Sequence, residues 1–366
     1  MTLPTEITAG DRGHRIAHVR LHRRANATVC AGDFATLQEA IDAAVAGGCD
    51  CVIPAGRYTL TETLNIAEVE GVHIRGAGCG EFGGGTTLNW AGADNVPAVL
   101  LSNTRRVLLS DFRLTCSEPA AVGLSVLNAG SGITPTACRF ENVAIDGISG
   151  GRLGKGWTVG GVDANNDFHI WTNCAAANYA TAGWSFEASQ SLNHMLINCK
   201  AAGAGGLYGV ANRLGPNAHG GSFHWIGGAM SNHAEADFYV GGYCSGGVSI
   251  ENAQCEGSAR LLSNPGPHGV RFPIAIRGTR FNPRDNLTEF IYQGGPGPLL
   301  VEGCTFEAYT DEQAGVMRID AGGFAPVTAT FIGCIVQTVA AEPFPATARL
   351  IDVHVVNRAT GEVIAL

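Results

Sequence analysis

The chain has 366 residues, of which only 15% are charged and 45% are hydrophobic, and its formal net charge is −9. An acidic chain repels phosphate backbones, and no apolar run reaches the roughly 20 residues of a membrane-spanning helix, so we expect neither nucleic acid nor a membrane as partner. The 51 glycines are too many for a helical protein and favour frequent tight turns.

Residues 1–31 form a basic arm in front of a folded domain that we expect over residues 32–366. The arm carries five arginines and three histidines, namely Arg12, Arg15, Arg20, Arg23, Arg24, His14, His18 and His22. A solvated terminus is the first interpretation, and docking to a larger assembly or to an anionic glycan is the alternative. The opening residues lack the apolar core of a secretory signal, which predicts a protein that is cytoplasmic at synthesis or associated with a virion.

One helix is predicted, over about residues 36–47. Thr36 and Glu39 have the spacing of a capping box, apolar residues follow at helical spacing, and Gly47 with Gly48 ends the helix. Such an amphipathic helix can cover the open end of a sheet. The next segment, CVIPAGRYTLTETLNI, is typical of a strand, a turn and a second strand.

From residue 50 to about residue 355 the chain repeats one pattern: a short alternating apolar stretch, a turn residue, then a second short stretch. The turn residues lie 25 to 35 residues apart and are Gly76, Asp111, Asn142, Asn173, Asn198, Gly227, Asn252, Gly278, Gly303 and Gly333. Three strands of about five residues and three turns fill such a repeat, which can bury its apolar face only against its neighbours. We therefore predict an all-β fold, a single-stranded parallel β-helix of about ten coils.

Four of the twelve cysteines follow directly after these turn residues: Cys174, Cys199, Cys304 and Cys334. Equivalent positions of successive coils lie above one another, so these side chains are predicted to stack as a ladder of small buried thiols. Disulfides and metal binding are the alternatives, and a long chain without a secretory signal favours thiols.

The run GDFATLQEAIDAAVAGGCDCVIPAGRYTLTETLNIAEVEGVHIRGAG resembles the N-terminal part of pectate-lyase-like β-helix proteins, which have the pectin lyase fold. The units TFIGC and LLVEGCTFE are similar to coils of the same superfamily, which includes phage tailspikes and polysaccharide depolymerases. The resemblance covers about residues 32–355 and implies a right-handed helix and carbohydrate ligands. These motifs specify the fold and leave the reaction open.

Polar and aromatic side chains that suit a sugar site concentrate between residues 160 and 260. Strand alternation predicts one column of side chains that faces outward. Its members are Ser185, Tyr208, Tyr239 and Arg260, with Glu187 beside them. The same register predicts that Trp184, Leu207, Phe238 and Ala259 face inward. A slip of one residue would reverse both assignments.

Aromatic rings stack on sugar faces, and charged groups bind hydroxyls and carboxylates. The residues predicted to bind substrate are His169, Trp171, Lys200, His224, Trp225 and His233. For any one tryptophan or histidine, filling the interior of a coil is the alternative interpretation.

Two reactions are candidates. A lyase needs a base beside a uronate carboxyl and a positive group for the enolate-like charge. Its candidates are Tyr208, Tyr239, Arg260 and Lys200, with Asp163 and Asp167 as ligands for a Ca²⁺ cofactor. A hydrolase needs two carboxylates, for which the candidates are Glu187, Glu235, Asp237 and Glu256. The predicted catalytic set is Glu187, Tyr208, Glu235, Asp237, Tyr239 and Arg260.

The sequence thus predicts a protein that binds and cleaves a polysaccharide on its outer face, as a lyase or a glycoside hydrolase. The first alternative is a non-catalytic tailspike or virion attachment protein, assembled as a homotrimer. The second alternative is an intracellular enzyme that acts on a small metabolite in a closed pocket.

Overall fold

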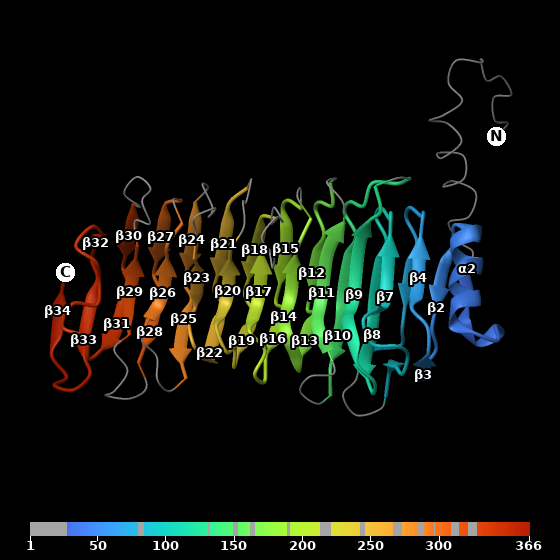
Figure 1. Cartoon of the computed structure of the whole chain (residues 1–366), viewed down its shortest axis with the longest axis horizontal. Helices are drawn as coiled ribbons and strands as arrows, with labels where there is room; N and C mark the ends of the chain where they lie inside the picture. The colour runs from blue at the N-terminus through green and yellow to red at the C-terminus, as the bar shows by residue number, and fades with distance from the viewer. Residues whose placement is uncertain are drawn as a thin grey trace, which may run out of the picture.

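The computed structural model describes residues 28–79, 84–130, 132–148, 153–161, 165–188, 191–212, 221–241, 246–265, 273–284, 289–295, 297–308, 315–320 and 328–366. These residues form a parallel β-helix of about ten coils, which confirms the predicted fold class. Figure 1 shows the coils side by side along the longest axis, between helix α2 (Leu37–Gly47) and the final strand β34 (Val363–Ala365). The predicted basic arm up to residue 27 lies outside the described residues.

One sheet has ten parallel strands. In order from the N-terminal side they are β4 (Leu64–Ala67), β7 (Pro97–Ser102), β9 (Ala120–Asn128), β11 (Leu153–Gly161), β14 (Tyr179–Phe186), β17 (Tyr208–Asn212), β20 (Ala236–Val240), β23 (Leu262–Asn264), β26 (Glu289–Gln293) and β29 (Val316–Ile319). Each strand pairs with the equivalent strand of the next coil, as expected for a parallel β-helix.

The other sheet has 24 strands in two rows, which the long strands β8 (Leu108–Cys116) and β10 (Arg139–Asp146) join. The first row continues with β1 (Thr28–Cys30), β2 (Asp50–Val52), β5 (His73–Arg75), β12 (Ile170–Thr172), β15 (His194–Ile197), β18 (Phe223–Ile226), β21 (Val248–Glu251), β24 (Ile274–Arg277), β27 (Leu299–Glu302), β30 (Ala329–Ile332) and β32 (Arg349–Ile351). The second row continues with β3 (Gly56–Leu60), β6 (Thr86–Trp90), β13 (Ala175–Ala177), β16 (Lys200–Ala202), β19 (Ala229–Ser231), β22 (Gln254–Ser258), β25 (Arg280–Pro283), β28 (Thr305–Glu307), β31 (Ile335–Thr338) and β33 (His354–Asn357). Strand β34 pairs antiparallel with β33.

Helix α2, preceded by the short 3₁₀ helix η1 (Ala31–Asp33), forms the predicted cap. Thr36 Oγ1 accepts a hydrogen bond from the Glu39 N–H at 3.2 Å, and a Glu39 carboxylate oxygen accepts one from the Thr36 N–H at 3.0 Å. The helix ends at Gly48, whose φ of 58° is a conformation that glycine tolerates. Its buried side, which includes Ile41, contacts β1, β2 and β4. The predicted capping box is confirmed.

Nine of the ten predicted turn residues, from Asp111 to Gly333, have left-handed backbone with φ between 51° and 68°. The amide of Asn142 donates to Asp111 Oδ1 at 3.0 Å, and that of Asn173 donates to Asn142 Oδ1 at 3.2 Å. Short polar side chains and glycine are the residues that adopt this conformation most readily. The periodic Asn, Asp and Gly of the sequence therefore mark one corner of each coil.

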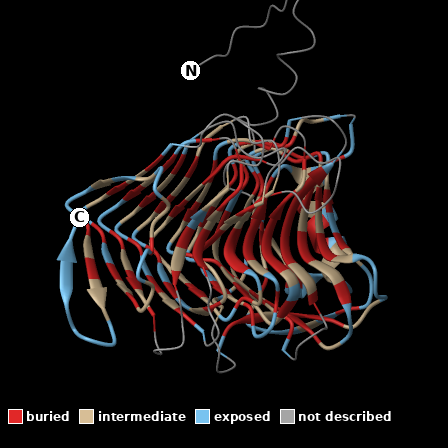
Figure 2. Ribbon diagram, turned by 60° about the vertical axis from the view of Figure 1, so that its left-hand side comes forward, coloured by how far each residue is buried: buried red, intermediate tan, exposed pale blue. Residues whose placement is uncertain are grey.

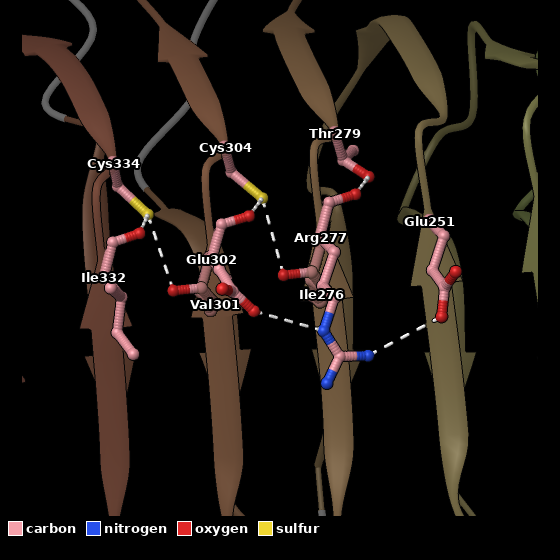
Figure 3. A network of polar contacts seen from close by, with 9 residues as sticks. All are labelled: Glu251, Ile276, Arg277, Thr279, Val301, Glu302, Cys304, Ile332 and Cys334. Atoms are coloured by element: carbon pink, nitrogen blue, oxygen red, sulfur yellow. Dashed lines mark hydrogen bonds and ion pairs between the residues drawn. The ribbon is translucent and has the colours of Figure 1, made fainter.

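The cysteines that follow these corners form the predicted ladder of buried thiols. Cys304 donates to the carbonyl oxygens of Glu302 and Ile276, and Cys334 makes the equivalent bonds one coil later (Figure 3). Thr279 holds the same place in an earlier coil, and its hydroxyl donates to the Arg277 carbonyl at 3.2 Å. All eleven cysteines within the described residues are free, so the prediction of thiols is confirmed there.

Inward-facing side chains fill the coils, which leaves exposed residues along the corners and ends (Figure 2). The coils between β10 and β20 hold fully buried aromatic rings, namely Phe140, Trp157, Trp171, Tyr179, Trp184, Phe186, Phe223, Trp225 and Phe238. Each ring buries a large apolar area, so this part of the interior is the densest in aromatic contacts. Within the described ranges, no helix is both long and apolar enough to cross a membrane.

Candidate functional site

Five residues predicted to bind or act on a substrate lie inside the β-helix. His169, Trp171, Trp225, His233 and Asp237 all have 0% of their surface exposed. A ligand on the outer face cannot touch them, so the prediction of direct substrate contact is wrong for these five. Their side chains fill the interior, which was the alternative interpretation for the tryptophans and histidines.

His169 belongs to a stacked pair in the interior. Its ring lies parallel to that of His194, with 5.3 Å between the ring centroids. Its Nδ1 accepts the Cys138 N–H at 3.1 Å, which leaves Nε2 to donate to Asn166 Oδ1 at 2.6 Å. Burial lowers the pKa of His169 to about 3, so the ring is neutral at physiological pH.

His233 and Asp237 belong to a buried network with Tyr179 and Ser258. His233 Nδ1 lies 2.6 Å from Asp237 Oδ1, and the Tyr179 hydroxyl lies 2.5 Å from His233 Nε2. Ser258 donates to the same Asp237 oxygen at 2.6 Å. Burial, and then the charge of Asp237, raises the pKa of Tyr179 well above its usual value. The other Asp237 oxygen, Oδ2, is buried with no hydrogen-bond partner among the described residues.

The predicted register is correct for two of the inward residues and wrong for a third. Trp184 and Phe238 face inward as expected, but the residue aligned between them is Val210. Leu207, predicted to occupy that place, is 37% exposed. Gly209 also faces inward, because a Cβ there would lie 2.5 Å from Met230 Sδ and 3.0 Å from His233 Cε1, both inside the helix. Two consecutive residues of β17 therefore point into the helix and break the alternation.

Tyr208 and Tyr239 are brought together on the outer face of the ten-stranded sheet. Their ring centroids lie 4.5 Å apart with 34° between the planes, and both side chains are partly exposed. Burial, with smaller contributions from Tyr239 and Glu235, raises the pKa of Tyr208 to about 12. The Tyr208 hydroxyl is therefore protonated at neutral pH and can donate a hydrogen bond to a ligand.

An ion pair lies on the N-terminal side of the two tyrosines. Lys155 Nζ is 2.5 Å from Glu187 Oε1, and Ser185 donates to the same oxygen at 2.6 Å. Lys155 aligns with Ala182, which aligns with Tyr208 on the next coil. The carboxylate of Glu187 is therefore on the same face as the tyrosines, as predicted.

A larger ion cluster lies on the C-terminal side. Arg260 Nε is 2.9 Å from Glu289 Oε2, and Arg260 Nη1 is 3.7 Å from Glu235 Oε2. Arg318 reaches the other Glu289 oxygen at 2.9 Å and Asp320 at 2.9 Å. The two tyrosines, the Lys155–Glu187 pair and this cluster together make up what we name the tyrosine face.

Four members of the tyrosine face lie outside residues 160–260, where the sequence predicts the site. Lys155 precedes that segment, Glu289 follows it by one coil, and Arg318 and Asp320 follow it by two. Strand register is the signal that could have identified Arg318. Arg318 aligns with Tyr292, and Tyr292 aligns through Ser263 with Tyr239. The guanidinium carbon of Arg318 lies 5.3 Å from the ring centroid of Tyr292.

Three other predicted residues lie on the 24-stranded sheet and are not brought to the tyrosine face. Lys200 is an exposed residue of β16, Glu256 an exposed residue of β22, and His224 a partly buried residue of β18. His224 Nδ1 lies 2.9 Å from the Ser249 hydroxyl on the next coil. The predicted site residues that lie outside the interior are therefore divided between the two sheets.

A recess of about 220 Å³ lies on the same 24-stranded sheet, near the C-terminal end. Polar residues line most of it, namely Arg280, Asn282, Glu307, Gln337 and Arg358. Two of these residues, Arg280 and Glu307, form an ion pair at 2.8 Å. None of these residues is among the site residues predicted from the sequence.

The predicted calcium ligands are not brought together within the described residues. Asp163 lies outside them. Asp167 is 7% exposed and accepts a hydrogen bond from the Leu192 N–H at 2.8 Å, and burial raises its pKa. No group of three metal-ligating side chains occurs in the part of the chain that the structure describes, and a role for calcium stays a prediction.

Solved structures of similar fold include two polysaccharide-acting enzymes and a tailspike. The A-module of mannuronan C-5 epimerase AlgE6 from Azotobacter vinelandii is 17% identical, with 90% of this chain and 99% of that chain covered and a TM-score of 0.54. The catalytic unit of a GH87 α-1,3-glucanase from Streptomyces thermodiastaticus is 16% identical, with 89% of this chain and 68% of that chain covered and a TM-score of 0.54. The Dettilon tailspike protein is 14% identical, with 92% of this chain and 69% of that chain covered and a TM-score of 0.55. No protein-family model and no curated protein matches the sequence. The likeness shows the fold, a right-handed parallel β-helix.

Proposed function

We propose that the protein binds a polysaccharide across the tyrosine face and hydrolyses it there. The observation that carries this proposal is the Tyr208–Tyr239 pair, partly exposed between two groups of hydrogen-bonding carboxylates and cations. Aromatic rings offer flat apolar surface to the faces of sugars, and the flanking polar groups bind their hydroxyls. The polysaccharide-acting enzymes of the same fold support this assignment without naming the sugar.

Hydrolysis is favoured over elimination by the protonation state of Tyr208. A lyase base must be deprotonated to take a proton, whereas the pKa of Tyr208 is raised to about 12. Two carboxylates flank the pair: Glu187 follows β14, on the coil before Tyr208, and Glu235 directly precedes β20, on the coil of Tyr239. Glycoside hydrolysis needs two such carboxyl groups, one as acid and one as base or nucleophile.

The test is a panel of neutral and acidic polysaccharides incubated with the protein. New reducing ends without ultraviolet absorbance are expected, since hydrolysis forms no unsaturated uronate. Reducing ends together with that absorbance would mean a lyase and would overturn the proposed reaction.

A matched pair of variants tests the location of the site. We expect Tyr239→Ala to weaken glycan binding about tenfold, because about 1 kcal/mol or more of aromatic stacking is lost, while Tyr239→Phe keeps most of the affinity. Affinity electrophoresis with the bound glycan measures both variants. Unchanged binding by Tyr239→Ala would place the site elsewhere.

A non-catalytic attachment protein, associated with a virion, is the second candidate function. The C-terminal hairpin favours it, because Val363, Ile364 and Leu366 are 59%, 45% and 48% exposed there. Exposed apolar side chains of this kind are typical of surfaces that assemble. Glycan binding without new reducing ends, together with a trimeric mass by light scattering, would favour this candidate over hydrolysis.

A further inference from the structure

We infer that the polysaccharide bound on the tyrosine face is uncharged and lies along the axis of the β-helix. The inference rests on the proposed function and adds the chemical class and direction of the ligand. Two observations carry it: the ion pairing of the described cations on this face, and the alignment of its outward residues from coil to coil.

The basic groups of the tyrosine face are already matched by carboxylates. Lys155 is paired with Glu187. Arg260 and Arg318 share Glu289, whose side chain is only 8% exposed between them. Each described cation of this face therefore has a carboxylate beside it, so a uronate gains little net attraction there and is repelled by that carboxylate.

The local charge also disfavours an acidic glycan. The tyrosine face carries four carboxylates, those of Glu187, Glu235, Glu289 and Asp320, against the three cations. The whole chain carries a formal net charge of −9, so long-range electrostatics also repel a polyanion.

Hydroxyl groups suit these ion pairs better than carboxylates do. A sugar hydroxyl both donates and accepts, so it can donate to a carboxylate such as Glu235 and accept from a guanidinium such as Arg260. Glu235 is 53% exposed and Arg260 is 28% exposed, so each has open surface for a further hydrogen bond. Neither ion pair has to break.

The direction of the ligand follows from strand register. Ser185, Ala211, Tyr239, Ser263 and Tyr292 align on five successive coils of the ten-stranded sheet. Neighbouring strands lie about 4.8 Å apart, which is close to the length of one sugar unit in a glycan chain. A chain that runs along the axis therefore advances by about one sugar per coil. Ser185 and Ala211 are covered, at 1% and 0% exposed, so the chain contacts Tyr239, Ser263 and Tyr292 of this row and passes both ion clusters.

The experiment compares a polyuronate with its carboxyl-reduced form, which has the same linkages and no charge. Binding of the full-length protein to each form is measured by affinity electrophoresis at low and at high salt. We expect the reduced, neutral form to bind at least about tenfold more tightly. Its affinity should not change with salt, because no ion pair forms with the ligand.

Glu289→Gln sharpens the test, because it leaves Arg260 and Arg318 without their shared carboxylate at nearly unchanged shape. We expect this variant to shift the affinity ratio towards the polyuronate by about tenfold. Glu235→Gln changes a more exposed member of the cluster and should shift the ratio in the same direction by less. It keeps the comparison possible should Glu289→Gln fail to fold.

The outcomes separate this inference from the proposed function. Salt-sensitive binding that favours the polyuronate, and that Tyr239→Ala abolishes, would overturn the inference and leave the polysaccharide site in place. If Tyr239→Ala binds both the polyuronate and its reduced form as tightly as the unsubstituted chain does, the proposed site is overturned, and the inference with it.

Discussion

The interior of the β-helix and its tyrosine face use the same kinds of side chain within the same coils. Glu235 and Asp237 are two residues apart, yet Glu235 is 53% exposed beside Arg260 while Asp237 is fully buried against His233. Residue type and spacing therefore do not decide which side of the sheet a polar group occupies.

Breaks in strand alternation account for this difference. Asp237 and Phe238 are consecutive and both buried, as are Gly209 and Val210 on the preceding coil. A regular strand would alternate its side chains between the two faces. The extra inward position gives the interior room for a polar network, and it shifts the tyrosines relative to the register expected from alternation.

The largest expected effect is a difference in the free energy of unfolding between a variant of the interior and a variant of the tyrosine face. Asp237→Ala should lower the free energy of unfolding by about 3 kcal/mol, because it leaves His233 and Ser258 without their buried acceptor. Glu235→Ala, only two residues away, should change it by no more than about 0.5 kcal/mol. Urea denaturation followed by tryptophan fluorescence measures both. Equal effects would mean that the two carboxylates do not differ in environment.

The next expected effect is a dependence of stability on pH that comes from the interior histidines. Burial holds the pKa of His169 at about 3 in the folded chain, against 6.5 ordinarily, and that of His194 is also lowered well below 6.5. The unfolded chain therefore binds protons first, and stability falls as pH drops from about 6.5 towards 3, by up to about 1.4 kcal/mol per pH unit for each histidine.

Urea midpoints at neutral and mildly acidic pH measure this dependence. His169→Gln, which keeps a hydrogen-bonding side chain without the titration, should flatten the slope. A slope identical to that of the unsubstituted chain would contradict the assignment to His169.

The smallest expected effect concerns the cysteine ladder. Cys304→Thr should change the free energy of unfolding by less than about 1 kcal/mol, because Thr279 already makes the equivalent bond one coil earlier. Cys304→Leu should cost about 1 to 3 kcal/mol by overpacking the same position. Comparable losses in both variants would show that the thiol has a role that a hydroxyl cannot fill.

Much of the fold could be predicted because its determinants are local and periodic. Asn142 and Asn173 mark corners through their own backbone preference, and Thr36 with Glu39 caps a helix over three residues. The site could be predicted only in part: Glu187, Tyr208 and Tyr239 were found on the outer face, whereas His169 and Trp171 were assigned there wrongly. Alternation gives two faces for each strand and does not say which is inside when a bulge intervenes.

Local or periodic signals in the chain account for the coil length, the corner residues, the capping helix and the thiol ladder, because each depends on residues close in the chain or repeated at one period. Three other features depend on how the coils stack: Asp237 is buried, Tyr208 meets Tyr239, and Glu289 joins Arg260 to Arg318. These contacts link residues of different coils, roughly 30 positions apart, so their partners depend on the register of stacked strands.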